Sequence, residues 1–521
     1  MAETDAPSIA RASAIVALGN IASRVLGLLR DIVLSNVFGA SRALESFNNA
    51  VLVSRSIFDL LIAGHVSSAI VPVLSEVEST QGRDALWRVL AALAGAVIAI
   101  LSVVVLVIIV SSGVIAGIID EDWQTVELTG RLIQLTAPAL LLMSLFALYS
   151  GTLYALRIFT YPALAAAVFN LTMVAVTLLF AHGQDGIYAV AAAWIAAAAA
   201  QLALQLYGLR RGKLGISFNF RDALVAPVLK RIGWLYVPVI GSLVVDLITT
   251  RFLTYALAAR AAIEYGNTYM TWATTLIQFP QGLVATAISA AVLPSLSRAA
   301  LQENQKEYDD TLGLGLRLTT ALILPAAAAL AVLAVPVIQL VYEHGAFTPY
   351  DTGITANALR LYLIGLPFAA WDLLLIYGFY AKQDTVTPAS IGVFSFGVYT
   401  VAALALFPAF GLYALMMADA VKHITHATLC AVLLIRRRGH LGDQRLMGTL
   451  IKSLIASAGM AGAAAIALNL FSGMFGWETL GEVLTVVLSL VVCGVSYAAI
   501  AYALKLEEFR MALALFTRRL R

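Results

Sequence analysis

The chain has 521 residues, of which 61% are hydrophobic and 12% charged, and its mean hydropathy is +0.89. Apolar runs of roughly 20 residues recur along the whole length, which excludes both a soluble globular domain and a lone membrane anchor with a polar remainder. The net charge of +3 says little by itself, and both cysteines, Cys430 and Cys493, lie in apolar runs, which argues against a structural disulfide or metal site.

The apolar segments predict an all-α, polytopic membrane protein with about 14 transmembrane helices. The connections between them are short and polar, and Pro and Gly punctuate them, as is common in membrane bundles. The segments cover residues 9–34, 45–74, 87–117, 129–155, 160–181, 187–209, 232–258, 267–296, 312–341, 355–380, 388–408, 411–435, 450–472 and 479–504.

The first segment carries charged residues inside its apolar run. On a helix Arg24 and Asp31 would share a face, whereas Arg24 and Arg30 would differ by roughly 120° around the axis. A charged side chain at membrane depth costs at least ~2.5–3.5 kcal/mol, so such groups usually face a bundle interior or a wet cavity. The alternative is that the arginines reach the headgroups from a helix end. Their axial separation of ~9 Å argues against both doing so, and we predict a charged lining.

Charged residues recur in the second and seventh segments. Glu45, Arg55 and Asp59 lie in the second, and Asp246 and Arg251 lie in the seventh. Cations and carboxylates at this depth can pair, which reduces their burial cost and provides a switchable network. For Asp246 and Arg251 a structural ion pair is an equal alternative.

Sequence motifs for catalysis are missing. There is no GxxxxGK[ST] phosphate loop, no HExxH and no paired-cysteine metal spacing. His423 and His426, beside Asp419 and Lys422, could form a proton relay, but we favour a satisfied polar cluster near a helix end; Asp419 and Asp372 are weaker candidates for function. The sequence therefore favours a transporter without a nucleotide-hydrolysis site over an enzyme.

Charge outside the helices predicts the orientation. The segments 210–231 and 436–452 and the C-terminal tail are basic and follow even-numbered helices, so they fall on one side, whereas acidic residues such as 120–122 fall on the other. The positive-inside rule then places both termini in the cytoplasm. Nucleic-acid binding is the alternative for the basic loops, but they are short and flanked by helices, so we expect no nucleic-acid partner.

The chain repeats itself at an offset of roughly 222–227 residues. Residues 151–155 resemble 378–381, residues 186–189 resemble 411–414, and 70–75 resemble 292–297. A duplicated six-helix unit in one orientation predicts two lobes related by an axis along the membrane normal, an architecture typical of transporters. The predicted parts are residues 1–220, 221–440, and a C-terminal helix pair with a basic tail at 441–521.

The charged lining also indicates a class of substrate. Arginine suits anions, above all phosphate or pyrophosphate, because its guanidinium donates hydrogen bonds in pairs. A lipid or sugar attached to such a group needs room as well, and the helix pair outside the repeat could provide a groove for a lipid tail.

Several motifs together resemble the MurJ/MviN family of the MOP exporter superfamily, and the likeness spans the whole chain. They are residues 23–31 (SRVLGLLRD), 38–40 (FGA), 71–74 (VPVL), 279–282 (FPQG), 293–297 (LPSLS), 345–351 (GAFTPYD) and 378–388 (GFYAKQDTVTP). The resemblance implies fourteen helices in two six-helix lobes and a groove-forming pair. It also implies flipping of lipid II, the undecaprenyl-pyrophosphate-linked peptidoglycan precursor, from the cytoplasmic to the outer leaflet.

The resemblance also assigns roles to residues. Arg24 and Arg30 match the arginines of helix 1 that line the family's cavity and engage the pyrophosphate. Glu45 takes the place of an acidic residue of helix 2. Asp246 falls near a helix 7 aspartate that joins a sodium site in some members, so a partial cation site is expected there and no other metal.

The chain departs from the family pattern at several positions. On helix 8 the family's arginine and glutamate become Thr275 and Gln278, and a lysine of helix 10 becomes Leu373. Helix 11 has no Asn or Asp within 391–405, so a complete sodium site is not implied. The substrate or the coupling could thus differ from the family standard.

The leading hypothesis is a lipid II flippase of the bacterial cytoplasmic membrane that works by alternating access as a monomer, without a cofactor. Membrane potential, Na⁺ or H⁺ would drive it. The predicted substrate-binding residues are Arg24, Arg30, Arg55 and Arg251, and the predicted gating and ion-pair residues are Asp31, Glu45, Asp59, Asp246 and Gln278.

Three alternatives remain open at this stage. The first is an exporter of another polyprenyl-linked oligosaccharide, which the altered helix 8 makes plausible. The second is a non-transporting membrane scaffold derived from a flippase. A drug or cation antiporter of the same superfamily ranks below these, because the expected cavity is cationic.

Overall fold

The computed structural model describes residues 6–58, 70–183, 185–222, 225–231, 244–302, 304–382, 384–438, 445–476, 479–509 and 511. Within these ranges all regular elements are helices and no strand occurs, which confirms the all-α prediction. The chain divides into two compact units, residues 1–268 (unit 1) and 269–521 (unit 2).

Unit 1 is built from pairs of packed helices. Helix α1 lies against α8, α8 and α7 against α9, α2 against α6, and α4 against α7. Small and aliphatic side chains of α3, α4, α7 and α9 form its buried core. The elements are α1 (Ala6–Phe38), α2 (Arg42–Phe58), α3 (Val71–Gln81), α4 (Arg83–Val110), α5 (Ser112–Ile119), α6 (Trp123–Thr136), α7 (Ala139–Ala155), α8 (Thr160–Phe180), α9 (Gly186–Gly208), the π-helical η3 (Leu247–Phe252) and α11 (Leu253–Ala259).

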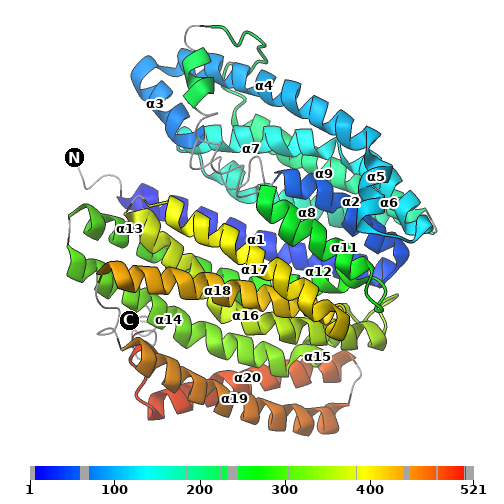
Figure 1. The fold of residues 1–521 in the computed structure, drawn as a ribbon, viewed down its shortest axis with the longest axis vertical. Helices are drawn as coiled ribbons and strands as arrows, with labels where there is room; N and C mark the ends of the chain where they lie inside the picture. Colours follow the sequence, from blue (N-terminus) through cyan, green and yellow to red (C-terminus); the bar gives the residue numbers. More distant parts are fainter. Residues whose placement is uncertain are drawn as a thin grey trace. The chain divides into compact units, whose positions relative to one another are not determined.

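Unit 2 is built from long helices that pack side by side. Figure 1 shows α14, α16 and α18 running alongside one another, with α19 against α14 and α20 against α19. The elements are α12 (Gly266–Pro280), which begins in unit 1, the π-helical η4 (Gln281–Thr286), α13 (Ala287–Leu301), α14 (Gln305–Val332), α15 (Ala334–Tyr342), α16 (Pro349–Ala381), α17 (Val386–Phe410), α18 (Tyr413–Arg438), α19 (Leu446–Phe475) and α20 (Thr479–Ala503).

Nine helices in the described part of the chain are long and apolar enough to cross a membrane, or ten if α6 and α7, bent by 40°, form one span. The predicted segments 9–34, 45–74, 232–258 and 267–296 are not among them. These are the first two segments of each predicted repeat, where charged and polar residues concentrate, and two of them are only partly described. A polytopic helical membrane protein is therefore confirmed, whereas the count of fourteen stays a prediction.

Residues 244–259 pack with unit 1, because α11 lies against α5 and Arg260 donates from its Nε to Glu121 at 2.8 Å. The division between the two compact units therefore lies between residues 268 and 269. The predicted division at 220/221 and 440/441 follows the internal repeat instead, and stays a prediction.

Glycine allows α1 to approach α8 closely. A Cβ atom added at Gly19 would lie 2.3 Å from the carbonyl oxygen of Ala163, and one added at Gly27 would lie 3.4 Å from Nδ2 of Asn170. Small residues at a helix interface let two backbones come together, which strengthens packing where lipid supplies no hydrophobic driving force. This approach brings Asn170 of α8 within reach of the charged stretch of α1.

The motif at 345–351 acts as a helix start. The hydroxyl of Thr348 accepts from the amide of Asp351 at 3.4 Å, and the Asp351 carboxylate accepts from the Thr348 amide at 2.8 Å, with Pro349 at the first helical position. This reciprocal capping box satisfies two amides at the start of α16. The opposite carboxylate oxygen of Asp351 accepts from the hydroxyl of Tyr269 at 2.7 Å, which ties α12 to α16.

Asp122 caps α6 in the acidic loop, and its removal is expected to weaken this helix. Its carboxylate accepts from the hydroxyl of Thr125 at 2.7 Å and from the Thr125 amide at 3.1 Å, and these bonds hold the pKa of Asp122 below its usual value. The stabilisation is therefore complete above the unfolded pKa of about 3.9 and is lost as the pH falls through the lowered folded pKa. Asp122→Ala should lower the free energy of unfolding by about 0.5–2 kcal/mol at pH 7.

Thermal unfolding of the detergent-solubilised protein as a function of pH measures this effect. The difference in unfolding temperature between Asp122→Ala and wild type should become smaller below about pH 4. Asp122→Asn, which keeps an acceptor without the charge, is the matched control and should lie closer to wild type at pH 7. A gap that widens in acid would contradict the capping role.

Candidate functional site

A chain of hydrogen bonds ties the charged stretch of α1 to α8. Both Nε and Nη2 of Arg30 donate to one carboxylate oxygen of Asp31, at 2.9 and 2.7 Å. Nη1 of Arg30 donates to the side-chain oxygen of Asn170 at 3.1 Å, and Nδ2 of Asn170 donates back to the main-chain carbonyl of Ser23 at 3.0 Å. The Asp31 side chain is only 4% exposed, whereas that of Arg30 is 22% exposed. Arg30 is thus the more exposed member of the pair.

Helical spacing places Asp31 on the face of Arg24, and the Asp31 carboxylate also pairs with its neighbour in the chain, Arg30, at 2.7 Å. The side chain of Arg24 is partly buried. Pairing within α1 lowers the cost of holding Arg30 and Asp31 at membrane depth.

A π-helical turn creates the second ion pair of unit 1. In an α-helix two residues five apart differ by about 140° in direction, so Asp246 and Arg251 would not meet. Element η3 follows i→i+5 bonding, which stacks such residues on one face. Nε of Arg251 lies 3.4 Å from the Asp246 carboxylate, and Nη1 lies 3.5 Å from the hydroxyl of Ser56 on α2. Both charged side chains remain partly exposed, at 32% for Arg251 and 19% for Asp246.

Glu45 is buried and joins α2 to the first residues of α12. Its two carboxylate oxygens accept from the amides of Asn267 and Thr268, at 3.1 and 2.9 Å, and from the Thr268 hydroxyl at 2.6 Å. Nδ2 of Asn267 donates to Oδ1 of Asn49 at 3.0 Å. A carboxylate suits this place, because the first amides of a helix lack partners within it and carry partial positive charge. Glu45, predicted as an ion-pair residue, thus has amide and hydroxyl partners here.

Glu45→Ala is expected to lower the free energy of unfolding by about 2 kcal/mol, because the amides of Asn267 and Thr268 lose their buried acceptor. Glu45→Gln should cost less than Glu45→Ala, since its one amide oxygen still accepts at Thr268, although its NH2 group then faces the amide N–H of Asn267. Thermal unfolding of the two variants beside wild type checks this. Equal losses for both would show that the negative charge, and not the acceptor, stabilises the contact.

The remaining predicted residues are not drawn together in the described part of the chain. Arg55 is exposed on α2, and Asp59 lies outside the described residues. On α12 the side chain of Gln278 is exposed, and the hydroxyl of Thr275 donates to the main-chain carbonyl of Thr271 at 3.1 Å.

The histidines of α18 fall into two clusters in unit 2. Lys422 and His423 lie 2.6 and 3.7 Å from the two carboxylate oxygens of Asp419. His426 instead contacts the carboxylate of Asp372 on α16 through Nδ1. The sequence grouped both histidines with Asp419, whereas the structure separates them.

Two participants were missed by reasoning from the sequence. Asn170 of α8 is an amide side chain in a run whose other polar residues are threonines and one tyrosine, and this contrast is the signal in the sequence. Arg317 of α14 is a lone arginine in another, and its side chain, 13% exposed, ion-pairs with Glu508 beyond α20 at 3.3 Å. The hydroxyl of Thr449 on α19 donates to the same glutamate at 3.0 Å. This cluster fastens the C-terminal helix pair to α14.

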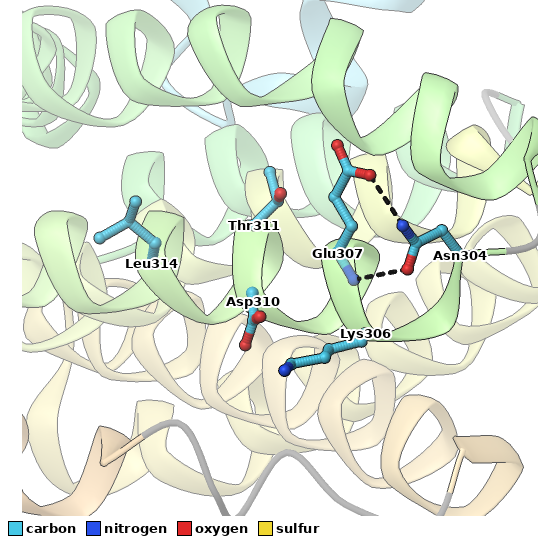
Figure 2. Close-up of a pocket in the computed structure, with 6 residues that line it drawn as sticks. All are labelled: Asn304, Lys306, Glu307, Asp310, Thr311 and Leu314. Carbon is cyan, nitrogen blue, oxygen red and sulfur yellow. Dashed lines mark hydrogen bonds between the residues drawn. The ribbon is translucent and has the colours of Figure 1, made fainter.

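A surface depression covers the first turns of α14 but includes none of these groups. Figure 2 shows that it lies beside the helix start, where Asn304 accepts from the Glu307 amide at 3.2 Å and donates to the Glu307 carboxylate at 3.0 Å. These bonds are those of an N-terminal cap. The residues that line it are Asn304, Lys306, Glu307, Asp310, Thr311 and Leu314.

Sequence comparisons agree with one another. A family model described as Lipid II flippase MurJ matches residues 34–488, a range that begins beyond Asp31. A protein of Burkholderia cenocepacia named lipid II flippase MurJ is 31% identical over 386 residues, which are 71% of this chain and 73% of the relative. A protein of Rhizobium meliloti named probable lipid II flippase MurJ is 28% identical over 473 residues, covering 89% of this chain and 87% of the relative.

Comparison with solved structures shows the fold. A lipid II flippase MurJ in an inward closed conformation superposes with a TM-score of 0.76 at 20% identity, over 94% of this chain and 99% of that one. An inward-facing multidrug resistance transporter of the MATE family in the MOP superfamily superposes with a TM-score of 0.70 at 14% identity, over 81% of this chain and 96% of that one. At these identities the likeness concerns the fold alone.

Proposed function

The chain belongs to the MurJ family of lipid II flippases, and from this premise we propose that it moves lipid II from the cytoplasmic to the outer leaflet of the bacterial cytoplasmic membrane by alternating access. Its role would then lie in peptidoglycan synthesis. Family membership supports a transporter rather than an enzyme.

The observation that carries the proposal is the arginine pairing of unit 1. Arg30 and Arg251 each pair with a more buried carboxylate, Asp31 and Asp246, and their own side chains are 22% and 32% exposed. A pyrophosphate can replace the carboxylate as the partner of such a guanidinium, because arginine donates the same charge-assisted hydrogen bonds to phosphate oxygens, often in pairs. Each carboxylate thus holds its arginine in place until substrate arrives.

The proposed cycle exchanges ion pairs as the conformation changes. Arg24 and Arg55 would join Arg30 and Arg251 around the substrate, while the carboxylates recover their arginines on release. Switching of this kind is favourable only if both states satisfy the buried charges, since an uncompensated buried charge costs several kcal/mol. We propose cytoplasmic termini on the charge distribution of the loops. We also propose a monomer without a cofactor that is driven by membrane potential, Na⁺ or H⁺.

Substrate binding tests the proposal directly. Native mass spectrometry of the purified full-length protein would compare lipid II with an undecaprenyl-linked oligosaccharide. The Arg24→Ala/Arg30→Met/Asp31→Asn variant would remove the cations together with the buried carboxylate beside Arg30, and Arg131→Ala, an exposed arginine paired with Glu127, is the control. Preferential lipid II binding that only the triple variant loses supports the proposal.

One alternative has an observation of its own. Thr275 and Gln278 stand where the family has charged residues, so a different polyprenyl-linked oligosaccharide is the second candidate substrate. Preference for the oligosaccharide would favour it. Binding of neither lipid would contradict transport of both and favour a scaffold.

A further inference from the structure

Three metal-ligating side chains converge between α16 and α18 in unit 2. The donor atoms of Asp372, His426 and Cys430 all lie within 4.8 Å of one another. Cys430 is fully buried, and the side chains of His426 and Asp372 are only 11% and 13% exposed. The cluster is separate from the arginine pairs of unit 1 and has no part in the proposed transport.

The surroundings fix the orientation of the imidazole. Nε2 of His426 lies 3.2 Å from the main-chain carbonyl of Pro388, which can only accept, so Nε2 carries a proton. In the neutral ring Nδ1 then has a free lone pair, and it points toward the Asp372 carboxylate and the Cys430 sulfur. Metal-ligating histidines commonly donate their second N–H to a carbonyl or carboxylate in this manner.

A lone pair and a carboxylate that face each other in a buried site need a cation between them, and the cation is either a proton or a metal ion. The position of Cys430 distinguishes the two. Zn–N and Zn–S bonds of about 2.0 and 2.3 Å at a tetrahedral angle place nitrogen and sulfur about 3.5 Å apart. The observed distance between Nδ1 of His426 and Sγ of Cys430 is 3.6 Å. The distance fits two ligands of one metal ion and also a hydrogen bond between residues one turn apart on α18, and metal titration separates the two cases.

We propose that Asp372, His426 and Cys430 bind a divalent transition-metal ion of the zinc class. One oxygen, one nitrogen and one thiolate ligand suit Zn²⁺, and a water molecule can complete the tetrahedron. The Asp372 carboxylate contacts Nδ1 directly and moves back to admit the ion. Lys422, one turn before His426 on α18, is neutralised by Asp419 at 2.6 Å and opposes the bound ion little. The ion cross-links α16 to α18.

Cobalt titration of the purified full-length protein tests the site, because Co²⁺ takes tetrahedral zinc sites and reports a thiolate ligand by charge-transfer absorption in the near ultraviolet. We expect saturation at one equivalent per chain and displacement by Zn²⁺. Cys430→Ser should abolish the charge-transfer band, and His426→Ala should weaken binding at least about tenfold. Cys493→Ser is the matched control, since Cys493 is also buried in an apolar helix, and it should bind as wild type does.

Folding is checked on the same samples by the thermal transition without metal, where Cys430→Ser should resemble wild type. Should Cys430→Ser fail to fold, two other samples test the site. Asp372→Asn should bind Co²⁺ more weakly than wild type, and wild-type protein stripped of metal by a chelator should bind one equivalent again. Absence of stoichiometric binding, an unchanged band in Cys430→Ser, or a band lost in Cys493→Ser would each overturn the proposal.

Discussion

Replacing Arg30 and Asp31 together, as Arg30→Met/Asp31→Asn, is expected to abolish lipid II flipping while the protein stays folded. Arg30→Ala alone is a poor test, because it takes the cation of Arg30 from the Asp31 carboxylate, 4% exposed, and so lowers stability as well as binding. The double replacement removes both charges, and the asparagine introduced in place of Asp31 keeps the size of the side chain. Loss of one buried charge-assisted contact of at least about 2 kcal/mol should reduce transport roughly 30-fold or more.

The measurement is translocation of a fluorescent lipid II analogue in proteoliposomes, with the thermal transition as the check on folding. Arg131→Met/Glu127→Gln is the matched control, because it removes an arginine–carboxylate pair whose side chains are 61% and 51% exposed. Such an exposed pair contributes about 0–1 kcal/mol, so the control should flip and fold as wild type. Wild-type transport in the Arg30 double variant would rule out a role for Arg30 in binding.

Glu508→Ala is expected to give the largest loss of stability, about 3–5 kcal/mol in the free energy of unfolding of unit 2. Its side chain is 2% exposed and ion-pairs with Arg317, 13% exposed, at 3.3 Å. Removing the glutamate leaves the guanidinium of Arg317 with the longer contact of 3.9 Å to the half-exposed Glu507, and it takes away the acceptor of the Thr449 hydroxyl on α19. The C-terminal helix pair should therefore detach from α14 at lower temperature than in wild type.

The neighbouring glutamate provides the control. Glu507 is 48% exposed, pairs with the exposed Arg445 at 2.6 Å and lies 3.9 Å from Arg317. Because Arg317 keeps Glu508 in this variant, Glu507→Ala should cost no more than about 1 kcal/mol. Arg317→Met/Glu508→Gln should recover most of the loss, because it removes the stranded charge. Differential scanning fluorimetry of the detergent-solubilised variants compares them. Equal effects of Glu507→Ala and Glu508→Ala would contradict the buried pair.

The order of amino acids is enough to predict the class of molecule and the positions of its charged residues. Long apolar runs specify membrane helices because lipid offers no hydrogen-bond partners, so the backbone must satisfy itself along the helix. The same rule makes every charge inside those runs conspicuous, and Arg30, Asp31, Asp246 and Arg251 were identified on this ground. Local caps such as the Thr348–Asp351 box are also encoded in a few neighbouring residues.

Which of these groups meet depends on how the helices pack. Asp31 pairs with Arg30, whose guanidinium also reaches Asn170 because α1 approaches α8 closely. Asp246 reaches Arg251 through a π-helical turn, which a search for the α-helical period of 100° per residue does not predict. Glu45 accepts from amides at a helix start more than 200 positions away along the chain. The physical reason is common to all three. A charge at membrane depth must be satisfied, but several partners can do so, and the packing of the helices selects among them.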